Sequence, residues 1–309
     1  MPTTPEAALR SRIGRIGAWV GAFTVAPAAQ ARPAAAEIEE LGYGTLWYPE
    51  GLGTRESFAN GAVLLAATER IVVASGITNI WGRDPVSSAC AARVLADSFD
   101  DRYLLGLGVS HKRQVDPRGH TYGKPVATMR AYLDGMDDDP FVSPDHGTTA
   151  SRPPVRRVLA ALRPPMLELA AERAQGAHTY LVPPEHTRRA REIMGPDALI
   201  IAEHKVIVGV PDAEARSRAR EALGWYLDTP NYQKNLLWLG YSEEDIAGGG
   251  SDRLVDELVA IGDEAAVRAR VQEHLNAGAD QVAIQPLGAA DDPFGLEMLR
   301  RLAPALSGL

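Results

Sequence analysis

The chain has 309 residues, of which 45% are hydrophobic and 23% charged, and its formal net charge is −8. This composition is typical of a soluble globular protein, and no stretch reaches the ~20 apolar residues that span a bilayer. An acidic chain without a basic stripe also argues against nucleic-acid binding. We therefore expect a cytoplasmic protein that acts on a small molecule, with neither membrane nor nucleic acid as a partner.

Apolar, strand-like runs alternate with amphipathic helical stretches along the whole chain. Such alternation indicates a parallel sheet, and eight units of this length favour closure into a (β/α)8 TIM-type barrel. The eight strands are expected within 15–23, 44–50, 72–79, 103–110, 156–162, 177–182, 198–210 and 279–287. The helices that follow them are expected within 33–41, 56–70, 85–99, 125–136, 164–175, 183–194, 212–227 and 295–306.

Two long insertions interrupt this alternation, one after the fourth strand (111–125) and one after the seventh (228–278). Long segments of this kind in compact domains are usually functional or mobile. The chain shows neither an internal repeat nor a low-complexity linker, so we expect residues 1–309 to form a single domain.

Active sites of TIM-type barrels lie at the C-terminal ends of the strands. That rule selects residues 47–50, 78–79, 110–111, 162–164 and 180–184. The third strand also breaks its apolar pattern at Ser75 and Gly76, and glycine inside a strand often marks a bulge or the close approach of a ligand. Gly106 and Gly108 expose backbone N–H groups near the end of the fourth strand, although they could equally form a layer of small residues inside the barrel.

Several other features have a structural and a chemical interpretation. His111 could exchange a proton near neutral pH or be a solvated loop residue. Pro164 begins a helix whose N-terminus could hold a phosphate, although proline is ordinary at that position. The seven histidines lack the spacing of a metal site, so we expect no metal. Neither a G-x-S-x-G motif nor a Walker-type loop is present.

The stretch VVASGITNIWGRDPVSSACAARVLADSFDDRYLLGLGVSH (72–111) resembles the luciferase-like monooxygenase superfamily, and within it the branch that uses the deazaflavin coenzyme F420. The segments GHTYGKPVATMRAYLDGMD and AHTYLVPPEHTRRAREIMGPD resemble the same branch. This resemblance implies an oxidoreductase that transfers a hydride between coenzyme F420 and a small organic substrate with a C=C, C=N or C=O bond. It also implies a homodimer.

The resemblance further implies roles for individual residues. The family has a non-proline cis peptide in a bulge behind the deazaflavin, which corresponds to Ser75–Gly76. Thr78 and Asn79 would point polar groups toward the ring, and His111 would supply a proton with Glu50 orienting it. The residues expected beside the cofactor ring are Gly106, Gly108, Val109 and Ser110, and those near its phosphate-bearing side are Leu162, Arg163 and Pro164.

Three departures from the family pattern leave alternatives open. Glu50-Gly51 stands where relatives often have an acidic residue followed by histidine, His111 where several have glutamate, and Arg163 where glycine is common. Arg163 could therefore contact phosphate or block the site. The alternatives are an FMN-dependent luciferase-like monooxygenase, a non-catalytic deazaflavin-binding barrel, and a chain that binds no redox cofactor.

Overall fold

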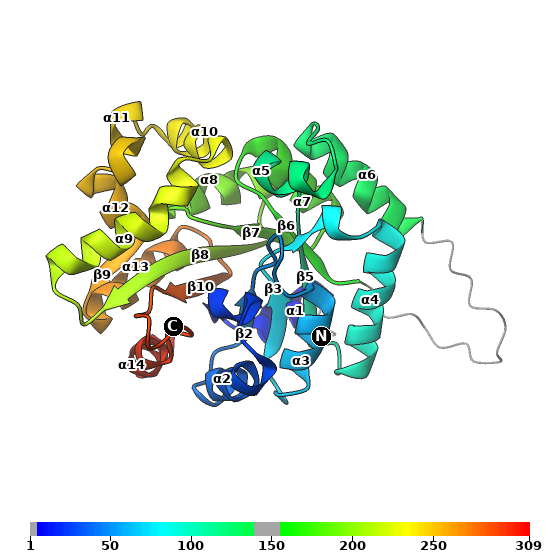
Figure 1. The fold of residues 1–309 in the computed structure, drawn as a ribbon, viewed down its shortest axis with the longest axis horizontal. Coiled ribbons are helices and arrows are strands. Elements are labelled where there is room, and N and C mark those ends of the chain that lie inside the picture. The colour runs from blue at the N-terminus through cyan, green and yellow to red at the C-terminus, as the bar shows by residue number, and fades with distance from the viewer. Residues whose placement is uncertain (1–4, 139–154) are drawn as a thin grey trace.

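The computed structural model describes residues 5–138 and 155–309, and its centre is a closed barrel of eight parallel strands (Figure 1). The last strand pairs with both the first and the seventh, and this double pairing closes the sheet. The (β/α)8 TIM-type fold predicted from the sequence is therefore confirmed. The barrel strands are β1 (Ile16–Trp19), β2 (Thr45–Tyr48), β3 (Val72–Ser75) with its continuation β4 (Thr78–Asn79), β5 (Tyr103–Gly108), β6 (Arg157–Ala160), β7 (Gly176–Thr179), β8 (Leu199–Val208) and β10 (Gln281–Pro286).

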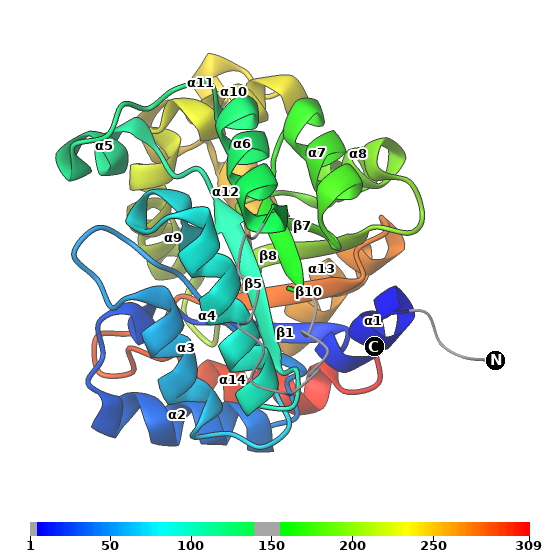
Figure 2. The same cartoon turned by 90° about the vertical axis from the view of Figure 1, so that its right-hand side faces the viewer.

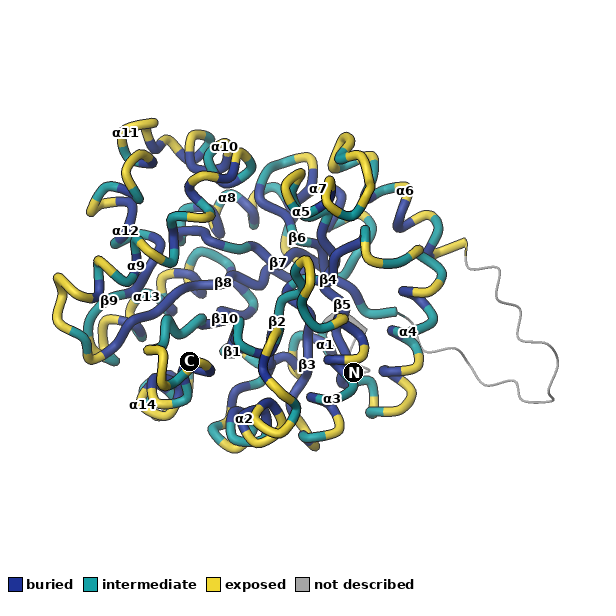
Figure 3. Tube along the Cα trace, in the orientation of Figure 1, coloured by how far each residue is buried: buried dark blue, intermediate teal, exposed yellow. Residues whose placement is uncertain are grey.

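Helices surround the barrel, with apolar faces on the strands and exposed faces outward (Figures 2 and 3). Those packed around it are α2 (Ala28–Glu40), α3 (Ser57–Leu65), α4 (Pro85–Ser98), α6 (Pro125–Asp137), α7 (Pro164–Arg173), α8 (Pro184–Met194), α13 (Glu264–Asn276) and α14 (Leu296–Leu306). Short 3₁₀ turns occupy Gly21–Thr24, Ile80–Gly82, Asp116–Arg118 and Ala247–Gly249. Helix α2 begins five residues before the predicted start at Pro33, which lies inside the helix.

A helix that the sequence did not predict, α1 (Pro5–Ile13), precedes the first strand. Its Leu9 and Ile13 are almost fully buried in one cluster with inward-facing strand residues such as Trp47 and Leu104. The helix therefore adds apolar side chains to the interior of the barrel, which is a packed core rather than a pore.

The third strand is interrupted where the sequence pattern breaks. Ala74 pairs with Leu104, but the next pairing joins Thr78 to Leu107, so four steps on one strand face three on the other. The third strand therefore has one extra residue relative to β5, and such an extra residue forms a β-bulge. The expected cis peptide lies one bond later than predicted, at Gly76–Ile77 rather than Ser75–Gly76.

Both predicted insertions are present, and they meet at one end of the barrel (Figures 1 and 2). The guanidinium of Arg113, in the first insertion, lies 3.5 Å from the centre of the Trp225 ring and donates a hydrogen bond to Thr229. The first insertion contains α5 (Lys112–Val115). The second insertion follows α9 (Asp212–Leu227) and contains α10 (Pro230–Leu239), α11 (Glu243–Ile246), α12 (Asp252–Leu258) and β9 (Val259–Gly262). Strand β9 pairs with β8.

Candidate active site

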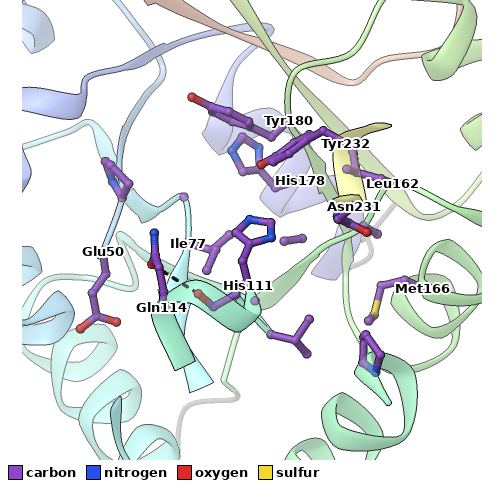
Figure 4. A pocket seen from close by; sticks show the side chains of 18 of the residues that line it. Glu50, Ile77, His111, Gln114, Leu162, Met166, His178, Tyr180, Asn231 and Tyr232 are labelled. Carbon is purple, nitrogen blue, oxygen red and sulfur yellow. Dashed lines mark hydrogen bonds between the residues drawn. The ribbon is translucent and has the colours of Figure 1, made fainter. Parts of the chain in front are cut away.

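A cavity of about 480 Å³ opens at the C-terminal ends of the barrel strands (Figure 4). Its walls come from the ends of β1, β2, β3, β5, β6 and β7, from α9, and from α10 of the second insertion. The site is therefore assembled from segments far apart in the sequence, at the end of the barrel where TIM-type enzymes carry their chemistry.

The structure separates the predicted site residues into two groups. Those that line the cavity are Glu50, Gly76, Gly108, Val109, Ser110, His111, Leu162 and Arg163. Those that are not part of its lining are Ser75, Thr78, Asn79, Gly106 and Pro164, although Pro165 does contribute to it.

The buried polar residues below the cavity hold the interrupted third strand in place. Ser75 Oγ accepts a hydrogen bond from the backbone N–H of Gly106 (2.9 Å) and donates one to its carbonyl oxygen (3.0 Å). Thr78 Oγ1 donates to Ser75 Oγ, and the side chain of Asn79 accepts from the N–H of Trp81. The side chains of Ser75 and Thr78 thus join β3, β4 and β5. Thr78 and Asn79 are not part of the cavity lining, and their expected contact with a bound ring stays a prediction.

Glu50 is held by an ion pair at the edge of the cavity. Its carboxylate lies 2.5 Å from Arg83 and also accepts hydrogen bonds from the backbone N–H groups of Ser57 and Asn79. Glu50 and His111 lie apart (Figure 4), and no hydrogen bond joins them among the described residues. The structure therefore shows no orienting contact from Glu50 to His111.

His111 lies in the middle of the cavity wall, immediately before α5. Its ring contacts Trp225 and Tyr232, both with centres 5.5 Å away. Burial, assisted by the charge of Arg113, lowers its pKa to about 4, which corrects the expectation of a value near 6.5. At neutral pH the imidazole is uncharged and can donate or accept a hydrogen bond.

Arg163 caps the N-terminal end of α7 and lines the cavity. Its guanidinium donates a hydrogen bond to the side-chain oxygen of Asn231 (3.1 Å), and it forms no ion pair with a described carboxylate. A guanidinium without a counter-ion at a cavity wall is suited to bind an anionic group of a ligand.

The wall formed by the third-strand bulge has no side chain at two positions, Gly76 and Gly108. A Cβ atom on Gly76 would lie 2.6 Å from Trp19 Nε1 and 3.1 Å from His178 Nε2, and one on Gly108 would lie 2.6 Å from Ile77 Cγ1. Trp19 Nε1 and both ring nitrogens of His178 are buried without a hydrogen-bond partner among the described residues. Burial lowers the pKa of His178 to about 3, so this ring is also neutral.

A sequence profile of the luciferase-like monooxygenase family matches residues 13–281, which include the barrel strands from β1 to β8 and the first residue of β10. The chain belongs to the luciferase-like monooxygenase family. As a member of that family it is an enzyme, and its cavity at the strand ends is the candidate active site.

Individual relatives of this luciferase-like protein share little sequence with it. A 5,10-methylenetetrahydromethanopterin reductase of Methanolobus tindarius is 27% identical over 151 residues, which are 45% of this chain and only 46% of that reductase. The F420-dependent tetrahydromethanopterin reductase of Methanopyrus kandleri has a similar fold (TM-score 0.74, 14% identity, 95% of this chain and all of the other). So does the oxygenating component of 3,6-diketocamphane monooxygenase from Pseudomonas putida, solved with FMN (TM-score 0.70, 16% identity, 95% and 98% covered).

Sequence reasoning missed several residues that line the cavity of this family member. Trp19 and His178 come from the ends of β1 and β7. The strand-end rule would have found them if it had also been applied to the first strand and begun two residues earlier on β7. Tyr180 lies within the range that the rule selects, but no feature of the sequence around it indicates a role. Tyr226 and Tyr232 come from α9 and α10, and nothing in their sequence context indicates that these helices reach the cavity.

Among residues 5–138 and 155–309, no group of three or more His, Cys, Asp or Glu side chains is arranged to hold a metal ion. None of the described helices combines the length and the apolar character needed to cross a membrane.

Proposed function

We propose that this protein is an F420-dependent oxidoreductase that transfers a hydride between coenzyme F420 and a small organic substrate with a C=C, C=N or C=O bond. The observation that carries the proposal is a cavity at the strand ends, walled by Gly76 and Gly108, in a chain of the luciferase-like family. The F420-dependent reductase with a similar fold supports the choice of cofactor.

The residues present fit a flat, phosphate-bearing ligand. Gly76 and Gly108 contribute no side chains of their own to the wall, and the side chains of Trp19, Ile77 and His178 fill the space beside them. A planar ring would therefore pack against a surface of apolar and ring atoms next to the backbone. Val109 and Ser110 continue this surface, and Arg163 lies farther along the wall with its guanidinium available for an anion. We assign the ring to the first group of residues and the phosphate-bearing side to Leu162 and Arg163.

Coenzyme F420, when bound, supplies a ring carbon that accepts or donates a hydride. The task of the protein is to hold the two partners in contact and to manage one proton. His111 is the side chain placed for the proton, because it lies in the cavity and is neutral at pH 7. A neutral imidazole can donate a hydrogen bond to a substrate oxygen or nitrogen while a charge develops there.

Two alternatives remain open. The fold of the FMN-bound component of 3,6-diketocamphane monooxygenase favours an FMN-dependent monooxygenase. The pairing of Glu50 with Arg83 favours a barrel that binds a deazaflavin without turnover, because this carboxylate is committed to structural contacts.

Parallel titrations with coenzyme F420 and FMN, followed by fluorescence and absorbance, test the proposal. We expect coenzyme F420 to bind with a Kd in the micromolar range or tighter, about −8 kcal/mol, and FMN to bind much more weakly. FMN binding as tight as or tighter than that of F420 would contradict the cofactor assignment. Turnover of carbonyls, enones or imines with reduced F420 then separates an enzyme from a binding protein.

A further inference from the structure

One side of the cavity is a continuous wall of aromatic rings that the proposed cofactor contacts do not use. The Tyr180 and Tyr226 ring centres lie 5.3 Å apart, and Tyr226 is 5.2 Å from Tyr232. Tyr232 in turn contacts His111. We call this surface the aromatic wall; its members are Trp19, His111, Tyr180, Trp225, Tyr226 and Tyr232.

The hydroxyl groups of two members are committed to hydrogen bonds within the protein. Lys205 Nζ donates to Gln285 Oε1 (3.3 Å), which identifies that oxygen as an acceptor. Tyr180 must therefore donate its proton to the same oxygen (2.9 Å), and Tyr226 must donate to the Tyr180 hydroxyl (2.8 Å). Since both protons are used, Tyr180 and Tyr226 offer a ligand their ring surfaces rather than free O–H donors.

A positive charge lies next to the same rings, on the inner side of the barrel. The Lys205 ammonium is 4.1 Å from the Tyr180 ring centre and 5.0 Å from that of Tyr226, and its side chain is 1% exposed. A cation over an aromatic ring is attracted by the ring's π electrons. Lys205 therefore already takes up this attraction at Tyr180 and Tyr226, and Arg113 does so at Trp225, 3.5 Å from the ring centre. Because protein cations occupy these ring faces, the wall disfavours a cationic ligand.

Within residues 5–138 and 155–309, the cavity lining offers no free negative charge to attract a cation. Glu203, the counter-ion of Lys205, lies 3.1 Å from it and also accepts a hydrogen bond from the backbone N–H of Leu181. Glu50 is the one carboxylate in the cavity lining formed by the described residues, and it is paired with Arg83. A ligand that packs against this wall must therefore gain its affinity from apolar and aromatic contact.

We propose that the aromatic wall is the substrate subsite and that it selects a neutral, ring-bearing compound over a cation of the same shape. This inference rests on the proposed function only in naming the ligand a substrate; the binding preference belongs to the wall itself. Aromatic pairs in offset or edge-to-face geometry contribute about 0.5–1.5 kcal/mol beyond the burial of their surface, which favours a ligand with a fused or conjugated ring system.

Calorimetric titration with quinoline and with N-methylquinolinium at pH 8 tests the preference, since the two probes share a fused ring system and differ in charge and in one methyl group. We expect quinoline to bind at least tenfold more tightly. Tyr232→Leu should weaken quinoline binding at least fivefold, whereas Tyr241→Leu should leave it unchanged. Tyr232 and Tyr241 are both 8% exposed, but only the first lines the cavity, so the second controls for loss of a buried tyrosine. Thermal unfolding of both variants shows whether they fold.

The titrations are run without cofactor and in the presence of saturating coenzyme F420. Independent binding of quinoline in the two conditions supports a separate substrate subsite, and competition between quinoline and F420 overturns it. Tighter or equal binding of N-methylquinolinium, or loss of affinity in Tyr241→Leu as large as in Tyr232→Leu, also overturns the inference. Failure of F420 itself to bind contradicts the proposed function, while the probe preference of the cofactor-free protein still decides the chemistry of the wall.

Discussion

The buried ion pair of Glu203 and Lys205 leads to a prediction about stability. Both side chains point from β8 into the barrel and are at most 1% exposed. Burial raises the pKa of Glu203, and it lowers that of Lys205. Lys205→Met would leave the Glu203 carboxylate without its counter-ion, and loss of one partner of a buried pair costs about 3–5 kcal/mol.

This free energy corresponds to a measurable change in melting temperature. Unfolding entropy of about 2.1 cal/mol/K per residue amounts to about 0.65 kcal/mol/K for 309 residues. The variant Lys205→Met should therefore melt about 5–8 °C lower than the unchanged protein. Circular dichroism on heating and urea unfolding at 25 °C both report this difference.

The double variant Glu203→Gln/Lys205→Met is the control. It removes both charges of this pair, and its glutamine oxygen can still accept the hydrogen bond from the N–H of Leu181. Replacement of both partners of a buried pair is often neutral, so we expect this protein to unfold within about 2 kcal/mol of the unchanged one.

The loss in Lys205→Met should also depend on pH. The raised pKa of Glu203 means that the folded variant binds this proton more tightly than the unfolded chain does, so the loss is small in acid and grows as pH rises above about 4.5. A double variant as unstable as the sum of the two single variants, or a loss in Lys205→Met that does not change with pH, would refute the reasoning.

Three further predictions concern the histidines and Arg163. His111→Ala should reduce turnover by about 10²–10⁴-fold with little change in F420 affinity. The pH–rate profile near pH 6.5 should stay the same in this variant, because burial lowers the pKa of the imidazole to about 4. Near-normal turnover of the variant would show that His111 takes no part in the mechanism. Arg163→Ala should weaken F420 binding and reduce its dependence on salt, and tighter binding would identify the arginine as an obstruction. The unchanged protein should lose stability as pH falls from about 6.5 toward 3, by about 1.4 kcal/mol per pH unit for each histidine buried in its neutral form; His178 and His274, whose pKa values are lowered to about 3 by burial, lead this loss. Urea unfolding at several pH values measures it, and His274→Gln should flatten the slope if the assignment is correct.

The fold followed from local patterns in the sequence. The ten residues of β8 are buried, and the apolar run at 198–210 predicted that strand because a strand covered on both faces reads as apolar. Helix α9 begins and ends at the predicted residues, since an amphipathic stretch with acidic residues in its first turn is a strong helix signal. Glu203, His204 and Lys205 lie inside this run, but the sequence did not reveal that Glu203 and Lys205 pair within the barrel.

The candidate site followed from the sequence only in part. The strand-end rule located His111 and Leu162, because the position of a residue at the end of a parallel strand is a local property. The break in the third strand predicted a bulge, although the cis peptide lies at Gly76–Ile77 and not one bond earlier. The sequence did not predict the hydrogen bond from Thr78 to Ser75, because strand alternation alone does not show whether a polar side chain meets a ligand or a neighbouring strand.

The sequence by itself determined the closed barrel, its two insertions and the end that carries the cavity, because each depends on the order and periodicity of neighbouring residues. Only the tertiary structure decided what surrounds a ligand there. Tyr180 follows β7, whereas Tyr226 and Tyr232 lie in α9 and α10; they form one wall because these two helices reach over the strand ends. The neutral state of His111 was decided in the same way, since its pKa depends on the rings of Trp225 and Tyr232 that bury it, more than a hundred residues away along the chain.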